Sequence, residues 1–280
     1  MQGNGKAGYF DERERGDLLQ SQLEATLAHK NDDVDVVVWP EGGSDLDPNE
    51  SRYAAQAFDY VSSLFDAPLV SGVITQRDEL TFNTSVLWRA GEGVVDYYDK
   101  KHPVPFGEYI PDRAFWRPFA PDLIDLVGRD YTPGTTDAVV DLGTAVAGLN
   151  ICFDIVDDQL MTETVEQGAQ VVFAQSNNAD FGRTDESVQQ LAIARIRAIE
   201  LGRSVVVIST VGTSAIIGPD GQTIDQLEWY TPDAMNVAVP LSNVVTPAVV
   251  VGRQLEWLVS FVGLAGVLVS AIALRRPRRG

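Results

Sequence analysis

Cysteine and histidine are almost absent from this chain of 280 residues. Cys152 is the only cysteine, so no disulfide can form within the chain, and there is no CxxC pair that would indicate a metal site. His29 and His102 are the only histidines, which leaves few candidates for a Ser-His-Asp triad. We therefore expect no metal and no cofactor, and Cys152 is the first residue to consider as a nucleophile.

Basic side chains are scarce in the body of the chain. The formal net charge is −19, and four arginines lie within residues 275–280, so 17 basic against 40 acidic side chains leave −23 for residues 1–274. A body this acidic argues against a nucleic-acid-binding surface. An apolar run that could serve as a signal peptide is also lacking, since Met1–Asp11 is polar and rich in glycine.

Cys152 lies where a buried strand is predicted to end. Residues 145–151 are apolar and few enough for a strand buried on both faces, and Asp154, Asp157 and Asp158 suit a loop and the acidic first turn of a helix. The end of a core strand holds a side chain rigidly and can present it to a cleft, as a nucleophile requires. A lone thiol is also commonly a small buried hydrophobe, so both interpretations stay open on this position alone.

Helical and strand patterns alternate along the rest of the chain, which indicates an α/β sandwich. Predicted helices cover residues 13–30, 50–65, 157–168 and 186–203, and predicted strands cover 34–39, 69–75, 82–89, 94–98, 171–175, 205–211 and 213–217. Glu41 follows a strand that stops at Pro40. Residues 103–111 contain four prolines or glycines, which stiffen a loop that would hold Lys100 and Glu108 in place. Taken alone, that loop would be interpreted as a solvated surface segment.

Two apolar stretches remain. Phe115, Trp116, Phe119, Leu123 and Ile124 suit either the core or a membrane-facing arm, and we expect core because large exposed apolar patches are rarer. Residues 257–274 are 18 uncharged residues followed by arginines, close to the ~20 residues that cross a bilayer. This stretch predicts a transmembrane helix with its basic tail in the cytoplasm.

Three motifs carry a resemblance to a known family. Trp-Pro-Glu at 39–41, Lys100 within the segment 98–109, and Asn-Ile-Cys-Phe-Asp at 150–154 occur in the order and approximate spacing of the Glu-Lys-Cys triad of the nitrilase (carbon–nitrogen hydrolase) superfamily. Within it, the chain is similar to the apolipoprotein N-acyltransferases. That similarity extends to the Val-Pro-Phe-Gly-Glu-Tyr loop at 104–109, the Asn-Asn-Ala-Asp-Phe-Gly loop at 177–182, the helix at 194–201 and the terminal span.

The resemblance implies a nitrilase-like α-β-β-α sandwich followed by one C-terminal transmembrane helix. The domains implied are a catalytic domain at 1–250, a membrane helix at 255–274 and a basic cytoplasmic tail at 275–280. The catalytic domain would lie on the extracytoplasmic side of the inner membrane of a bacterial cell. The family also carries membrane helices and a buried strand upstream of a Gln-Gly-Asn sequence like that at 2–4, so we expect the catalytic domain to lack its first strand here.

The resemblance further implies acyl transfer in two steps through a thioester on Cys152. Glu41 would be the general base, and Lys100 with the backbone N–H of Phe153 would stabilise the oxyanion. Glu108 would position Lys100, and Asp154 would support the site. The donor would be a membrane phospholipid, and the acceptor the amine of a diacylglyceryl-cysteine on a lipoprotein.

Some positions depart from the family pattern. Phe153 and Asp154 stand where tyrosine and glutamate are usual, and Asp180 stands where tryptophan is common. These departures bear on acyl-chain and acceptor preference more than on the reaction type. Two alternatives therefore stay open: a membrane-tethered amidase that uses the same triad with water, and an inactive domain that binds lipoproteins.

Overall fold

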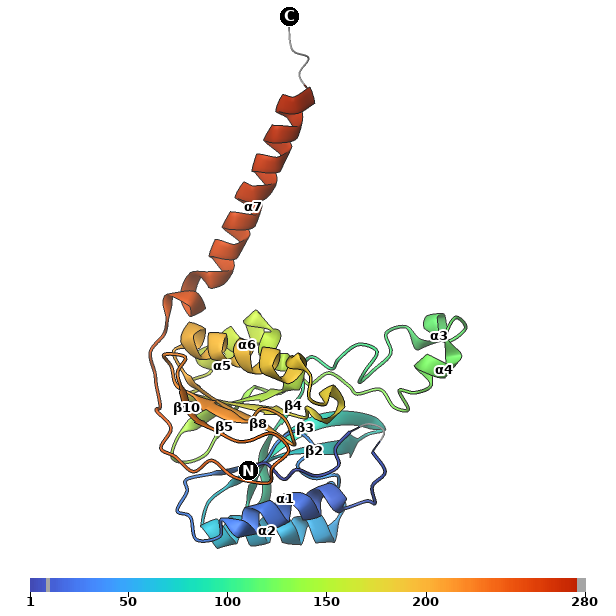
Figure 1. Ribbon diagram of the computed structural model, residues 1–280, viewed down its shortest axis with the longest axis vertical. Coiled ribbons are helices and arrows are strands. Elements are labelled where there is room, and N and C mark those ends of the chain that lie inside the picture. Colours follow the sequence, from blue (N-terminus) through green and yellow to red (C-terminus); the bar gives the residue numbers. More distant parts are fainter. Residues whose placement is uncertain (9–10, 276–280) are drawn as a thin grey trace, which may run out of the picture.

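A computed structural model describes residues 1–8 and 11–275, with side chains described as far as Ala271. Two β-sheets lie face to face, with helices on both outer sides, as Figure 1 shows. The predicted α-β-β-α sandwich is therefore confirmed. The tail at 276–280 lies outside the described residues.

The first sheet has four strands in the order β1-β2-β3-β4. They are β1 (Val37–Val38), β2 (Leu69–Arg77), β3 (Leu80–Arg89) and β4 (Gly93–Asp99). Helices α1 (Asp17–Ala28) and α2 (Arg52–Phe65) cover its outer face. The strand expected at 34–39 shrinks to two residues, yet it still directs the chain toward Glu41.

A buried aromatic stack joins α2 to this sheet. The Phe58 ring packs edge-on against Trp39 and Trp88, with centroid separations of 5.4 and 5.6 Å. The indole of Trp39 also donates to Thr26 Oγ1 of α1 at 3.0 Å. Aromatic edge-to-face pairs stabilise beyond their buried area, so the strand that leads to Glu41 is held firmly from behind.

The second sheet has six strands in the order β10-β9-β8-β7-β6-β5. They are β5 (Val139–Asp141), β6 (Val146–Ile151), β7 (Val171–Ser176), β8 (Ser204–Ser209), β9 (Ala215–Ile217) and β10 (Thr223–Gln226). Strands β6, β7 and β8 are parallel, with Ile151 paired to Gln175. The carboxyl ends of these strands therefore meet along one edge of the sheet, where Cys152 emerges.

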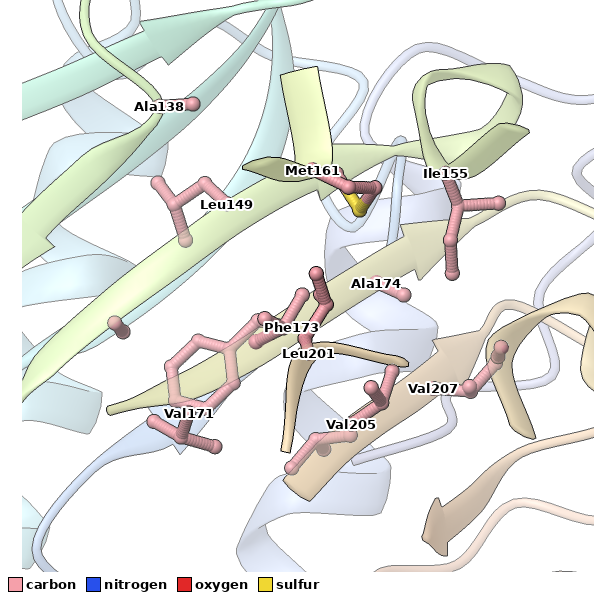
Figure 2. Packing of buried hydrophobic residues seen from close by; sticks show 14 of the residues in the cluster. Ala138, Leu149, Ile155, Met161, Val171, Phe173, Ala174, Leu201, Val205 and Val207 are labelled. Atoms are coloured by element: carbon pink, nitrogen blue, oxygen red, sulfur yellow. The ribbon is translucent and has the colours of Figure 1, made fainter. Parts of the chain in front are cut away.

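Helices α5 (Asp158–Glu166) and α6 (Asp185–Leu201) cover the second sheet. Figure 2 shows the buried side chains between them, among them Leu149, Met161, Phe173 and Val205. All of these positions are apolar and buried, as expected for parallel strands covered by helices. The strand that ends just before Cys152 therefore packs into this cluster, which is larger than the buried cluster of the first sheet.

The segment 102–131 leaves the sandwich and forms an arm at one side of it (Figure 1). The arm contains α3 (Arg113–Trp116) and α4 (Pro121–Ile124). The prediction that its apolar residues join the core is wrong for Phe115, Trp116, Phe119 and Leu123, all of which are exposed. Ile124 is buried, but in a small cluster with Ile110 and Val127 inside the arm itself. Apolar content alone does not reveal whether another element covers a segment, which is why the sequence misled here.

Helix α7 (Pro247–Arg275) extends away from the body (Figure 1). Among the described residues, it is the one helix long and apolar enough to cross a membrane, over Pro247–Ala271. It begins inside the range predicted for the body, because its first turn packs on α6. Val249 belongs to the main core cluster, and Thr246 Oγ1 donates to the carbonyl of Glu200.

Candidate active site

Lys100 is the centre of a buried cluster of charges. It follows β4 directly, and its side chain is 1% exposed. The Lys100 Nζ lies 2.7 Å from Glu108 Oε2 and 3.6 Å from Glu41 Oε1. A buried ammonium needs compensating charge, and these two carboxylates supply it. The structure thus brings together three of the residues that the sequence singled out.

Glu41 is fixed by two further donors. Its Oε1 accepts from the side-chain amide of Asn83 at 2.7 Å, and its Oε2 accepts from the backbone N–H of Asn177 at 2.8 Å. Gly72 of β2 lies directly below, where an added Cβ would come 2.5 Å from the Pro40 carbonyl oxygen. The close approach of the two backbones therefore requires glycine at this position.

Glu108 is held by the loop that bears it. Its Oε2 accepts from the backbone N–H of Val104 at 2.7 Å, in addition to the ammonium of Lys100. Its Oε1 accepts from Asn83 Nδ2 at 3.1 Å. One amide group of Asn83 therefore contacts both carboxylates and sets their spacing around Lys100. Asn83 lies within β3 without any motif around it, so sequence reasoning missed it.

Cys152 stands at the turn between β6 and a short 3-10 helix, η1 (Cys152–Val156). Its φ of 51° is in the left-handed region, which a non-glycine residue adopts at a cost of order 1–3 kcal/mol. Such strain is commonly kept where a side chain must project into a site. The thiol is half-buried and borders a cavity of about 10 Å³, enough for about one water molecule.

Asp154 anchors the turn from below. It is fully buried, and it accepts from Tyr98 Oη at 2.7 Å and from the backbone N–H of His102 at 2.9 Å. The carboxylate thus ties η1 to the end of β4 and to the loop that carries Glu108. Phe153, in contrast, is 44% exposed and points away from the core.

The electrostatics follow from burial. Burial raises the pKa of Glu41, against the opposing charge of Lys100. Burial acts to lower the pKa of Lys100, but the negative charges of Glu41, of Cys152 in its thiolate form and of Glu108 outweigh it and leave the pKa raised. Burial and the Glu41 carboxylate raise the pKa of Cys152 to about 12. The resting site therefore holds a thiol and an ammonium.

Among the described residues, no group of three or more His, Cys, Asp or Glu side chains is arranged to hold a metal ion. The chemistry available is that of a thiol, a buried carboxylate base and a fixed cation. Those three groups suit attack on a carbonyl carbon and stabilisation of the resulting oxyanion.

The two-sheet sandwich, with a thiol, a carboxylate and an ammonium at its strand ends, can be compared with known protein families. Residues 10–246 match the carbon-nitrogen hydrolase family, and the chain belongs to that family. Solved structures agree on the fold. A Nesterenkonia amidase from the nitrilase superfamily superposes with a TM-score of 0.57 at 16% identity, over 75% of this chain and 79% of that one. A carbon-nitrogen hydrolase from Helicobacter pylori gives 0.55 at 15% identity, over 78% and 80%.

Curated relatives indicate which members of the family the chain resembles in sequence. The chain is similar to the apolipoprotein N-acyltransferase of Mycolicibacterium smegmatis, with 34% identity over 84% of this chain and 40% of that one. It is also similar to that of Vibrio cholerae, with 27% identity over 90% of this chain and 50% of that one. The resemblance stated from the motifs is confirmed. The chain spans about half the length, or less, of these relatives.

Proposed function

We propose that this chain is the catalytic part of a membrane-anchored apolipoprotein N-acyltransferase. The observation that carries the proposal is the ammonium of Lys100, buried between Glu41 and Glu108. Tyr98, two residues before Lys100, donates to Asp154 in the turn that carries Cys152, the only thiol in the chain. The similarity to curated N-acyltransferases over most of the chain supports the same reaction.

In the first half-reaction, the Cys152 sulfur attacks the ester carbonyl of a phospholipid. Glu41 takes the thiol proton, because a thiol with a pKa of about 12 is otherwise protonated at neutral pH. Lys100 and the backbone N–H of Phe153 stabilise the oxyanion. As the carbon–oxygen bond breaks, protonated Glu41 returns its proton to the leaving alcohol, a lysophospholipid. Cys152 is left as a thioester.

In the second half-reaction, the amine of a diacylglyceryl-cysteine attacks the thioester. Glu41 removes a proton from the attacking nitrogen, and the same donors stabilise the second oxyanion. Collapse forms the amide and releases the Cys152 sulfur, which takes the proton back from Glu41. The scheme is ping-pong, since lysophospholipid leaves before the acceptor reacts.

A membrane setting fits the rest of the molecule. Helix α7 is long and apolar enough to span a bilayer, and the exposed aromatic residues of the arm suit contact with lipid. We propose that α7 crosses the inner membrane with the arginines of 275–280 in the cytoplasm and Cys152 on the other side. Donor and acceptor, both lipid-bearing, would then reach the site from the membrane surface.

Mass spectrometry of the intact chain tests the proposal. Incubation with phospholipid vesicles is expected to add one acyl chain to Cys152, and a diacylglyceryl lipopeptide is expected to remove it while gaining the same mass. Cys152→Ser is the control and should acquire no acyl chain. Loss of the adduct as free fatty acid, with no lipopeptide product, would indicate the hydrolase alternative. Binding of lipopeptide with no adduct under any condition would indicate the inactive binding domain.

A further inference from the structure

The Cys152 sulfur has a neighbour that lies apart from the charged cluster. Gln190 of α6 places its side-chain amide Nε2 at 3.8 Å from Cys152 Sγ, within the range of a hydrogen bond to sulfur. Gln190 also lines the small cavity beside the thiol. The charged groups Glu41, Lys100 and Glu108 all come from the first sheet and its loops, whereas Gln190 comes from the helix that covers the second sheet.

The direction of the Gln190 amide is fixed by a second residue. Its Oε1 accepts from Asn178 Nδ2 at 2.8 Å, so its NH₂ group must face the other way, toward the sulfur. Asn178 is itself buried, and Ser176 donates to its Oδ1 at 3.4 Å. Gly212 packs so closely on Asn178 that a Cβ there would come 2.5 Å from the same oxygen. In the structure, the donors of this chain of contacts run from Ser176 through Asn178 and Gln190 to Cys152.

No charged side chain of α6 competes for the sulfur. The guanidinium of Arg197, two turns further along α6, donates instead to the carbonyls of Ile155 and Val156 and to Asp158. Glu41, Lys100 and Glu108 act on the thiol electrostatically from the first sheet and its loops, and the neutral Gln190 contacts its sulfur from α6.

We propose that Gln190 is a positioning residue for the nucleophile: its amide N–H occupies a lone pair of the Cys152 sulfur and directs the S–H proton toward Glu41. The inference rests on the proposed function for its catalytic meaning, but the contact itself can be tested without it. After proton transfer, the same N–H stabilises the thiolate. Gln190 therefore favours the reactive form at both stages.

Alkylation by iodoacetamide tests the contact directly, because Cys152 is the only thiol in the chain. Gln190→Met keeps the length and helix propensity of the side chain but removes the donor. We expect alkylation at a given pH to slow about tenfold, at the lower end of the contribution of a hydrogen bond to a charged group. The variant should then need about one pH unit more to reach the wild-type rate. Gln190→Glu should slow alkylation further, because it adds a negative charge.

Gln189 provides the matched control. It is the preceding residue of α6 and is exposed, so Gln189→Met and Gln189→Glu should alkylate at the wild-type rate within about twofold, as surface substitutions change little. A purely structural role for Gln190 predicts the opposite sign, since a loosened α6 would expose the thiol and speed its alkylation. Alkylation of Gln190→Met at or above the wild-type rate would therefore overturn the inference, as would equal slowing in the Gln189 variants.

Acylation by phospholipid, measured on the same variants, separates this inference from the proposed function. If alkylation follows the expected order but the wild type never gains an acyl chain, the proposed function fails and the contact stands. If the wild type is acylated and Gln190→Met alkylates normally, the contact fails and the function stands.

Discussion

Replacing Asp154 tests how the nucleophile turn is held. Asp154→Ala leaves the buried Tyr98 hydroxyl and the partly buried His102 N–H without their acceptor. Each unsatisfied buried donor costs about 1–3 kcal/mol, so the free energy of unfolding should fall by about 4 kcal/mol. At about 2–4 °C per kcal/mol for a body of this size, the unfolding midpoint should drop by about 8–16 °C.

Thermal unfolding followed by intrinsic fluorescence, in one fixed detergent, measures the loss. Asp35→Ala is the control, because Asp35 is exposed and precedes β1. Adding Tyr98→Phe to Asp154→Ala removes one of the stranded donors, so the double variant should be more stable than Asp154→Ala alone. An unfolding midpoint for Asp154→Ala within about 2 °C of the wild type, far short of the expected drop, would refute this account of the turn.

Asp154 also carries a pH signature. Burial raises the pKa of its carboxyl, so ionisation is harder in the folded state than in the unfolded chain. Stability from such a group is fully present below the unfolded pKa and is lost as pH rises through the folded pKa. Wild type should therefore gain stability relative to Asp154→Asn as the pH falls toward about 4. A difference that stays constant over that range would contradict the assignment.

Further predictions concern the charged cluster and are read from the rate of Cys152 acylation. Lys100→Ala should lower the rate by about 10²–10³, as for loss of an oxyanion donor; a loss under tenfold would argue against that role. Gly72→Ala should lower the rate of Cys152 acylation even where the variant stays folded, because the added methyl displaces Glu41; an unchanged rate would contradict this geometry. Asn83→Asp should slow the reaction, since a third carboxylate replaces the donor shared by the other two; wild-type rates would show that the shared amide is dispensable. The rate should fall on acidification through the raised pKa of Glu41, because only its ionised form accepts a proton; an acid limb at the pH of an ordinary glutamate would contradict the effect of burial.

Much of the site follows from strand periodicity. Val37, Val38 and residues 145–151 identify buried strands, and the residues just after them reach the sheet edge because parallel strands share a direction. The places of Glu41 and Cys152 at strand ends were therefore predictable from local sequence, whereas their roles came from the resemblance. Lys100 follows the second strand of a hairpin, but local sequence favoured a solvated surface loop there, and only the resemblance singled this residue out.

The residues that escaped prediction are polar side chains inside regular elements. Asn83 lies in the middle of a strand and Gln190 in the middle of a helix. At such positions, periodicity predicts whether a side chain faces the core or the solvent, but not which residue it contacts. Gln175 is a third case: it receives a hydrogen bond from Ser85 and donates to the Trp39 carbonyl, joining the two sheets. Such contacts link positions far apart in the chain, so they become visible only when the sheets are placed face to face.

The docking of α7 on α6 has a consequence for how substrates would be found. Val249 and Arg203, whose guanidinium donates to the Val244 carbonyl at 2.5 Å, fix the base of the helix to the catalytic body. In the proposed membrane setting, the site would stay beside the lipid surface and meet donors by lateral diffusion in two dimensions. Tethering of this kind raises the effective concentration of donor lipid at the site to the millimolar range or above. Weak intrinsic affinity for the donor would then suffice, and discrimination among lipids would rest on fit around Cys152 during the reaction itself.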